Sequence, residues 1–284
     1  MRLFLVIALL LWQSLAHADT SVWKVTKGEQ SLFIGGTLHV LAPSDYPLPD
    51  SYSESYLQAQ TLVFETDLSA LSTPDLQLRM LSVLTYPKGK DLKSVLKQKT
   101  YQRLNTYCQA RGLPLDNFLK FKPALLTITL TMIELQRMGI SSAGVDQHFY
   151  KQATKDGKPL LELETNEQQL QFLAAMGEGQ EDQLILSTLD DIDVLADMMT
   201  TLKSAWRSGN SNKLLDIAIM PMIRDYPELY QNLLVARNNN WLPQIKAMFE
   251  TPETEFILVG ALHLVGPDGI IERLQKDGYR VEQL

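Results

Sequence analysis

Two histidines follow glycines at the same spacing near opposite ends of the chain. His39 comes three residues after Gly36 in "FIGGTLHVL", and His263 comes three residues after Gly260 in "FILVGALHLV". An apolar run typical of a buried strand precedes each glycine. Glycine lets the backbone turn sharply and removes a side chain from the space beside it. Since only four histidines occur in the chain, two in matching settings suggest that two imidazoles converge on one site.

A carboxylate is expected at the same place. Glu65 ends the apolar run "TLVFE", and residues that follow the strands of an open α/β sheet gather at its carboxyl edge. Two imidazoles and one carboxylate can hold a divalent metal such as manganese, cobalt or zinc, with open positions for water and substrate. Such a metal lowers the pKa of bound water to about 7. His39, Glu65 and His263 are therefore the predicted ligands; the alternative is that each histidine only hydrogen-bonds to its own turn.

Three further charged residues are candidates for the same chemistry. Glu164 follows the predicted strand "KPLLELE" and could bind the metal or act as a general base on its water; alternatively it lies on an exposed edge strand. Arg237 and Asn238 are expected to end a helix in "LLVARNNNW". There the arginine could anchor a carboxylate or oxyanion, or merely interact with the helix dipole. Asp146, two residues after Gly144, is expected in the first turn of another helix.

Composition and missing motifs exclude several other functions. The formal net charge of −7 argues against nucleic acid and against an anionic membrane surface as partners. Neither the G-x-S-x-G turn of serine hydrolases nor H-E-x-x-H nor a phosphate-binding P-loop occurs. Cys108 is the single cysteine, so the chain forms no internal disulfide and its stability must come from a packed core.

The predicted fold is α/β, with a central sheet built from two repeated strand-GxxH-helix-strand units at the chain ends. We expect these units to lie side by side with right-handed crossovers. Residues 22–35 predict a hairpin around Lys27-Gly28-Glu29. A mostly helical insert is predicted from about residue 70 to residue 250, with one strand near 159–164. Thr165 with Gln168 is predicted to form the capping box of the helix that follows this strand. Residues 19–284 are expected to form a single domain.

The first 18 residues have the pattern of a secretory signal peptide. Arg2 is followed by an apolar stretch over residues 3–12 and by an A-x-A cleavage site at residues 16–18. That stretch is too short to span a bilayer, and no later run approaches the roughly 20 apolar residues required. We therefore expect an exported protein, periplasmic or alternatively secreted, with no transmembrane segment after cleavage.

The ordered motifs resemble those of the TraB/GumN family, which is related to the Tiki metalloproteases and has an EreA/ChaN-like fold. The similar stretches are "GGTLHVL", "LVFETD", "AGVDQHFYKQATKDGKPLLELET", "RNNNW" and "VGALHLVGPDGIIERLQKDGYRV". The resemblance covers nearly all of the chain after residue 18 and implies duplicated strand-helix units with a site at the sheet edge. The motif matches fall on Gly36, His39, Glu65, Gly144, Asp146, Glu164, Arg237, Asn238, Gly260 and His263. Among these, the resemblance implies substrate-binding or supporting roles for Gly36, Asp146, Asn238 and Gly260.

The sequence therefore predicts an exported metal-dependent hydrolase, in the first place a peptidase acting on a peptide or small-molecule substrate. The two GxxH histidines and Glu65 would hold the metal. Glu164 would bind the metal or orient its water, and Arg237 would anchor the substrate or an oxyanion. The alternative is a non-catalytic periplasmic protein that binds a peptide, haem or another small ligand with the same residues. A third interpretation is a structural protein of the cell envelope.

Overall fold

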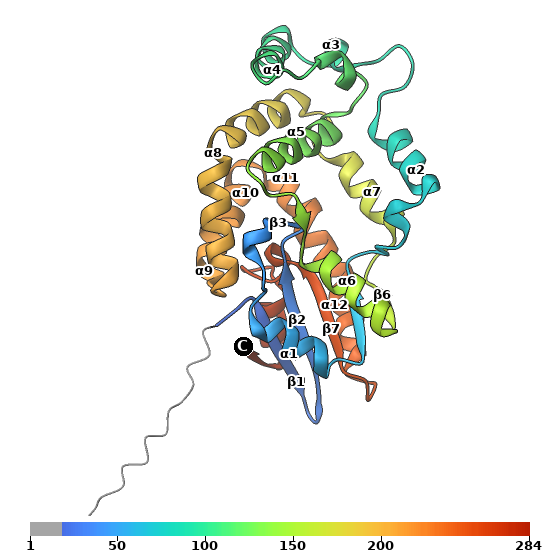
Figure 1. Cartoon of the computed structure of the whole chain (residues 1–284), viewed down its shortest axis with the longest axis vertical. Coiled ribbons are helices and arrows are strands. Elements are labelled where there is room, and N and C mark those ends of the chain that lie inside the picture. Colours follow the sequence, from blue (N-terminus) through green and yellow to red (C-terminus); the bar gives the residue numbers. More distant parts are fainter. Residues whose placement is uncertain (1–18) are drawn as a thin grey trace, which may run out of the picture.

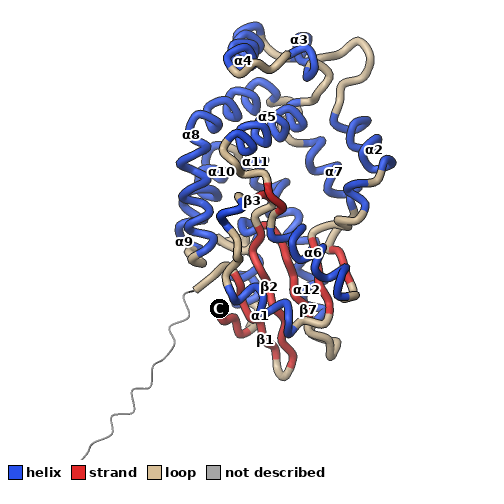
Figure 2. The backbone as a smooth tube through the Cα atoms, in the orientation of Figure 1, coloured by secondary structure: helices blue, strands red, loops and turns tan. Residues whose placement is uncertain are grey.

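One six-stranded sheet brings the two ends of the chain together. The computed structural model describes residues 19–284 (Figures 1 and 2). The strand order of the sheet is β6-β4-β7-β2-β1-β8. The predicted signal peptide lies outside the described residues. The strands of this sheet are β1 (Val22–Lys27), β2 (Gln30–Thr37), β4 (Thr61–Phe64), β6 (Leu160–Glu162), β7 (Glu255–Gly260) and β8 (Arg280–Gln283).

The strand pairing confirms that both GxxH units build the sheet. β2 pairs in parallel with β7, which pairs in parallel with β4, while β1 is antiparallel to both β2 and β8. β7 of the second unit thus lies between the two strands of the first. The register places Thr37, and not Gly36, opposite Gly260. The hairpin between β1 and β2 turns at Gly28, where φ is 61°, so the predicted turn is confirmed.

Two helices cover one face of this sheet. Figure 1 shows α1 (Asp50–Gln58) and α6 (Val145–Asp156) in front of the strands. Their aromatic rings pack on Phe256 of β7, with ring centroids 6.4 Å away for Tyr52 and 5.8 Å away for Phe149. Because side chains alternate along a strand, the face that carries Phe256 also carries Leu258 and the position of Gly260. This face therefore leads to the carboxyl edge of the sheet.

The insert is mostly helical, as predicted. A second hydrophobic cluster, which includes Leu104, Cys108, Leu126 and Ile185, packs its helices together away from the sheet core. No helix within residues 19–284 is long and apolar enough to cross a membrane. The remaining helices are α2 (Pro74–Leu84), α3 (Leu92–Val95), α4 (Gln98–Ala110), α5 (Pro123–Arg137), α7 (Asn166–Ala175), α8 (Glu181–Arg207), α9 (Ser211–Leu214), α10 (Met220–Asp225), α11 (Pro227–Tyr230), α12 (Ala236–Met248) and α13 (Ile270–Lys276).

Local signals in the insert are largely confirmed. The predicted strand near 159–164 is β6, and the Thr165 and Gln168 side chains form the capping box of α7. The structure adds β5 (Ser142–Ala143), which pairs with β3 (Val40–Leu41) in a separate two-stranded sheet. Strands of two residues leave no periodic pattern, so the sequence did not predict them. They join the turn after β2 to the segment that leads into α6.

Candidate active site at the carboxyl edge of the sheet

The ends of three parallel strands bring the predicted chemical residues together. His39 follows β2, Glu65 follows β4, and His263 lies in the short 3-10 turn after β7. A Cβ atom added to Gly260 would lie 3.2 Å from Glu65 Oε1, 3.5 Å from His263 Cδ2 and 3.9 Å from His39 Nε2. The three side chains therefore converge on Gly260, where an added Cβ atom would be tight against Glu65.

Gly36, in contrast, serves packing. A Cβ atom there would lie 3.1 Å from Cα of Ala261, so this glycine lets β2 approach the turn after β7. Its carbonyl oxygen accepts hydrogen bonds from Tyr52 Oη and Trp206 Nε1. Gly36 therefore fixes the position of the His263 turn and does not face the site.

Arg237 is the buried cation that joins the two glutamates. Its Nη2 lies 2.6 Å from Glu65 Oε2 and 2.6 Å from Glu164 Oε1, and its Nε lies 3.0 and 3.1 Å from the two Glu164 oxygens. The side chains are 5%, 9% and 3% exposed for Arg237, Glu65 and Glu164. Buried charges require such pairing, so Arg237 contacts protein carboxylates in this arrangement.

The structure corrects the predicted place of Arg237 in its helix. We expected it to end a helix, but it is the second residue of α12, and α12 directly follows a π-helical turn, Gln231–Val235. The asparagines at 238–240 lie within α12 and do not end it. Asn238 instead uses its side chain in tertiary contacts: Nδ2 donates to the backbone oxygens of His263 and Asp268 at 3.0 and 2.9 Å.

Asn238 also determines which nitrogen of His263 carries the proton. Because its Nδ2 faces two carbonyl oxygens, its Oδ1 is left as an acceptor and lies 2.7 Å from His263 Nδ1. His263 therefore carries its proton on Nδ1, and Nε2 accepts from Arg237 Nη1 at 3.1 Å. Burial lowers the pKa of His263 to about 3, although Glu65 acts in the opposite direction, so the ring is neutral at pH 7.

The pKa values of the two glutamates are shifted in opposite directions. Burial acts to raise the pKa of Glu65, but the positive charges of His263 (when protonated), Arg237 and His39, with the Gly260 N–H bond of 2.7 Å, lower it to about 2. Since His263 is neutral at pH 7, Arg237 is the main cation there. For Glu164, burial outweighs the contacts with Arg237 and the pKa is raised. Glu65 is therefore the firmly ionised carboxylate.

His39 forms a pair with Asp146. Its Nδ1 lies 3.4 Å from Asp146 Oδ1 in the first turn of α6. Desolvation acts to lower the pKa of His39, but the carboxylates of Asp146 and Glu65 raise it to about 9. The side chain is 64% exposed, so water screens the attraction between His39 and Asp146. His39 is charged at neutral pH.

Gly144 makes this pair possible. It precedes α6, and a Cβ atom there would lie 2.1 Å from the carbonyl oxygen of Leu38. The same oxygen accepts a hydrogen bond from Val145 N at 3.1 Å. Only glycine allows this close approach, which places Asp146 beside His39.

Trp241 is a site residue to which the sequence alone assigned no role. It is fully buried, and its Nε1 donates to Glu164 Oε2 at 3.1 Å. Its ring lies 4.4 Å from the His263 ring and 4.6 Å from the Arg237 guanidinium carbon. The signal was the spacing of Arg237 and Trp241, four residues apart and hence on one helix face.

A cavity of about 260 Å³ opens beside these residues. Its lining includes His39, Glu65, Asp146 and Thr37, together with Phe64 and Leu258 on the same face of the sheet. Glu164, Arg237 and His263 do not line it, but Arg237 contacts Glu65, which does.

The predicted metal ligands do not fit a metal ion in this arrangement. The Nε2 lone pair of His263 points to Arg237, whereas His39 Nε2 and Glu65 Oε1 approach the space beside Gly260. Within residues 19–284, no three His, Cys, Asp or Glu side chains are grouped so as to hold a metal. Binding by all three would require Arg237 to leave His263.

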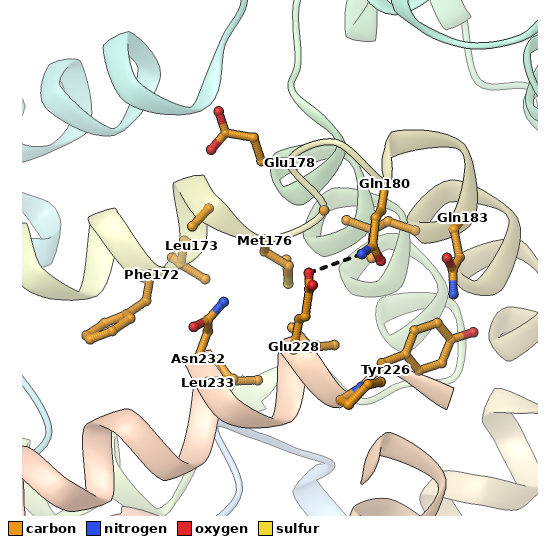
Figure 3. Close-up of a pocket in the computed structure, with 15 residues that line it drawn as sticks. Phe172, Leu173, Met176, Glu178, Gln180, Gln183, Tyr226, Glu228, Asn232 and Leu233 are labelled. Carbon is orange, nitrogen blue, oxygen red and sulfur yellow. Dashed lines mark hydrogen bonds between the residues drawn. The ribbon is translucent and has the colours of Figure 1, made fainter. Parts of the chain in front are cut away.

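A second, apolar cavity lies among the helices. Figure 3 shows it between α7, the start of α8 and α11, with Phe172, Leu173 and Met176 on one side. Its volume is about 140 Å³, and a hydrogen bond of 3.1 Å joins Gln180 Nε2 to Glu228 at its rim. None of the residues predicted for chemistry lines it, so it is separate from the candidate site.

Comparisons with known proteins agree with the family resemblance of the motifs. The "Uncharacterized protein YbaP" of Escherichia coli (strain K12) is 24% identical, over 87% of this chain and 89% of its own length. The human "Metalloprotease TIKI1" is 23% identical, over 94% of this chain and 62% of its own length. No solved structure matches the chain. The model of the TraB/PrgY/gumN family matches residues 21–283, and the chain therefore belongs to this family.

Proposed function

We propose that the chain is a hydrolase, in the first place a peptidase, with its site in the cavity at the carboxyl edge of the sheet. One observation carries this proposal: an ionised carboxylate oxygen, Glu65 Oε1, and a nitrogen of a charged imidazole, His39 Nε2, approach the same space beside Gly260. The similarity to the human protein named as a metalloprotease supports a peptide as the substrate.

These two groups have complementary roles in hydrolysis. Glu65 accepts a hydrogen bond from the attacking water and takes its proton as the C–O bond forms, and this proton passes to the leaving nitrogen as the C–N bond breaks. The Nε2–H of His39 donates to the carbonyl oxygen. Asp146 orients His39 through Nδ1. Glu164 holds Arg237, which in turn keeps Glu65 ionised and in place.

A peptide-library digest read by mass spectrometry tests this proposal. Residues 19–284 should cleave peptides, and Glu65→Gln should abolish the cleavage. Glu162→Gln is the matched control, because Glu162 is exposed on β6 and should keep full activity. Absence of cleavage, together with a stable complex with peptide or haem, would favour the binding protein instead.

Metal dependence is a separate proposal, supported only by the donor types of His39, Glu65 and His263, and it requires Arg237 to leave His263 Nε2. The digest is therefore run with EDTA and with added manganese, cobalt or zinc. Metal content is measured for the wild type, His39→Ala and His263→Ala. Equal and negligible metal in all three, with activity that EDTA does not reduce, would exclude the metal site.

We also propose that the chain is exported to the periplasm, because residues 1–18 have the pattern of a signal peptide. Expression of the full chain in a Gram-negative host should give a periplasmic protein that begins at Asp19. A cytoplasmic protein with an intact N-terminus would contradict export.

A further inference from the structure

Thr37 carries a buried hydroxyl that has no hydrogen-bond partner among the described residues. It is the last residue of β2, is 2% exposed, and lines the 260 Å³ cavity. Buried polar side chains are nearly always paired, with protein groups or with ordered water. Because Thr37 also lines a cavity, its unpaired Oγ1 indicates that a molecule outside the chain completes its hydrogen bonding.

The register of the sheet shows what surrounds this hydroxyl. Thr37 pairs with Gly260 in parallel β2 and β7, and paired residues point to the same face about 4.8 Å apart. Thr37, Glu65 and His39 all line the 260 Å³ cavity. Three polar side chains, a hydroxyl, a carboxylate and an imidazole, thus border this part of the cavity, which is called the hollow below.

We propose that this hollow binds one water molecule, held by Thr37 Oγ1 together with Glu65 Oε1 and His39 Nε2. A buried water needs two to four polar partners, and these three groups supply them. The water donates to Glu65 and shares a hydrogen bond with Thr37, which can donate or accept. It accepts from His39 Nε2–H until the carbonyl oxygen of the substrate takes over this donor. This inference rests on the proposed function in one respect: the bound water is the molecule that attacks the substrate, and Thr37 fixes its position.

A crystal structure of residues 19–284 at about 1.2 Å resolution tests the water directly, whether or not a substrate is known. An ordered water within hydrogen-bond distance of Thr37 Oγ1 and Glu65 is expected in the wild type and in Thr37→Ser. It should be absent or displaced in Thr37→Val, which has nearly the same shape and suits a strand. A hydroxyl that bonds to a protein group, or a wild-type hollow without water, would overturn the inference.

Kinetics with a cleaved peptide test the role of the water. Thr37→Val should lower kcat about tenfold with little change in KM, because it removes one hydrogen bond to the nucleophile. Thr37→Ser should restore most of the loss, and the melting temperature of Thr37→Val should not fall. Unchanged kcat in Thr37→Val would refute the role of Thr37 in positioning the nucleophile.

Ser55 provides the matched control. It is fully buried in α1, its hydroxyl also lacks a partner among the described residues, and it does not line the cavity. Ser55→Ala should leave kcat unchanged, and an equal loss in both variants would assign the effect to general packing. If the wild type cleaves no peptide, the proposed function fails, while the crystallographic water still decides whether the hollow is a binding site.

Discussion

Replacement of Arg237 by methionine tests the charge arrangement of the site. Arg237 donates four hydrogen bonds to carboxylate oxygens, three to Glu164 and one to Glu65. Methionine keeps much of the side-chain volume but leaves two buried carboxylates without their cation. Removal of one partner of a buried ion pair costs about 3–5 kcal/mol. We expect a loss of this size in the free energy of unfolding, measured by urea denaturation at pH 7.

The loss of unfolding free energy in Arg237→Met should be smaller at low pH. In the wild type the pKa of Glu65 is about 2, below the ordinary value of 4.5, so its contribution to stability is present above pH 4.5 and is lost as the pH falls toward 2. Without Arg237, burial raises the pKa values of Glu65 and Glu164. At low pH both carboxylates are therefore protonated in the variant, and no unpaired negative charge is buried. The difference between variant and wild type should therefore be smaller at pH 4 than at pH 7.

Two comparisons separate this effect from a general effect of losing an arginine. Arg79 also makes a two-pronged contact, to Glu167 at 2.9 and 2.7 Å, but both side chains are about half exposed. Arg79→Met should therefore be nearly neutral. Glu164→Gln combined with Arg237→Met should cost less than the sum of the single changes. A loss below about 1 kcal/mol at pH 7, or a loss that does not depend on pH, would refute the buried-triad account.

Three further predictions concern the groups around the buried triad of Arg237, Glu65 and Glu164. Asp146→Asn should lower the pKa of His39 from about 9 toward or below its ordinary value of 6.5, measured by NMR titration; in the wild type the stability from this pair is present below pH 6.5 and is lost as the pH rises through about 9. Trp241→Phe keeps a ring but removes the N–H that bonds to Glu164, and should cost about 1.5–3 kcal/mol in urea denaturation. Gly144→Ala places a methyl group within 2.1 Å of a backbone oxygen and should lower the melting temperature and separate His39 from Asp146.

Each of these predictions has a clear contrary result. An unchanged titration of His39 in Asp146→Asn would show that the pair does not form in solution. Equal stability of Trp241→Phe and wild type would show that the Trp241 hydrogen bond contributes nothing. A fully stable Gly144→Ala would show that the start of α6 does not pack closely against the turn after β2.

The fold was predictable wherever the signal was local. The Gly28 turn, the capping box of Thr165 with Gln168 and the two GxxH strands depend on residues close in sequence, and the structure contains them all. The strand order was harder, because the pairing of β4 with β7 joins residues nearly 200 positions apart. Arg237 was misplaced for a similar reason, since the side chain of Asn238 makes tertiary contacts and does not end the helix.

The sequence by itself determined which groups reach the sheet edge: two histidines after glycine turns and a glutamate after a strand, because alternation and turn chemistry place them there. Only the tertiary structure decided what these groups contact. Arg237 lies 172 residues after Glu65 in the sequence and binds its carboxylate. Asn238 accepts a hydrogen bond from the protonated Nδ1 of His263, so that the unprotonated Nε2 faces Arg237. Such contacts depend on how a distant helix packs against the strand ends, and no local pattern encodes that packing.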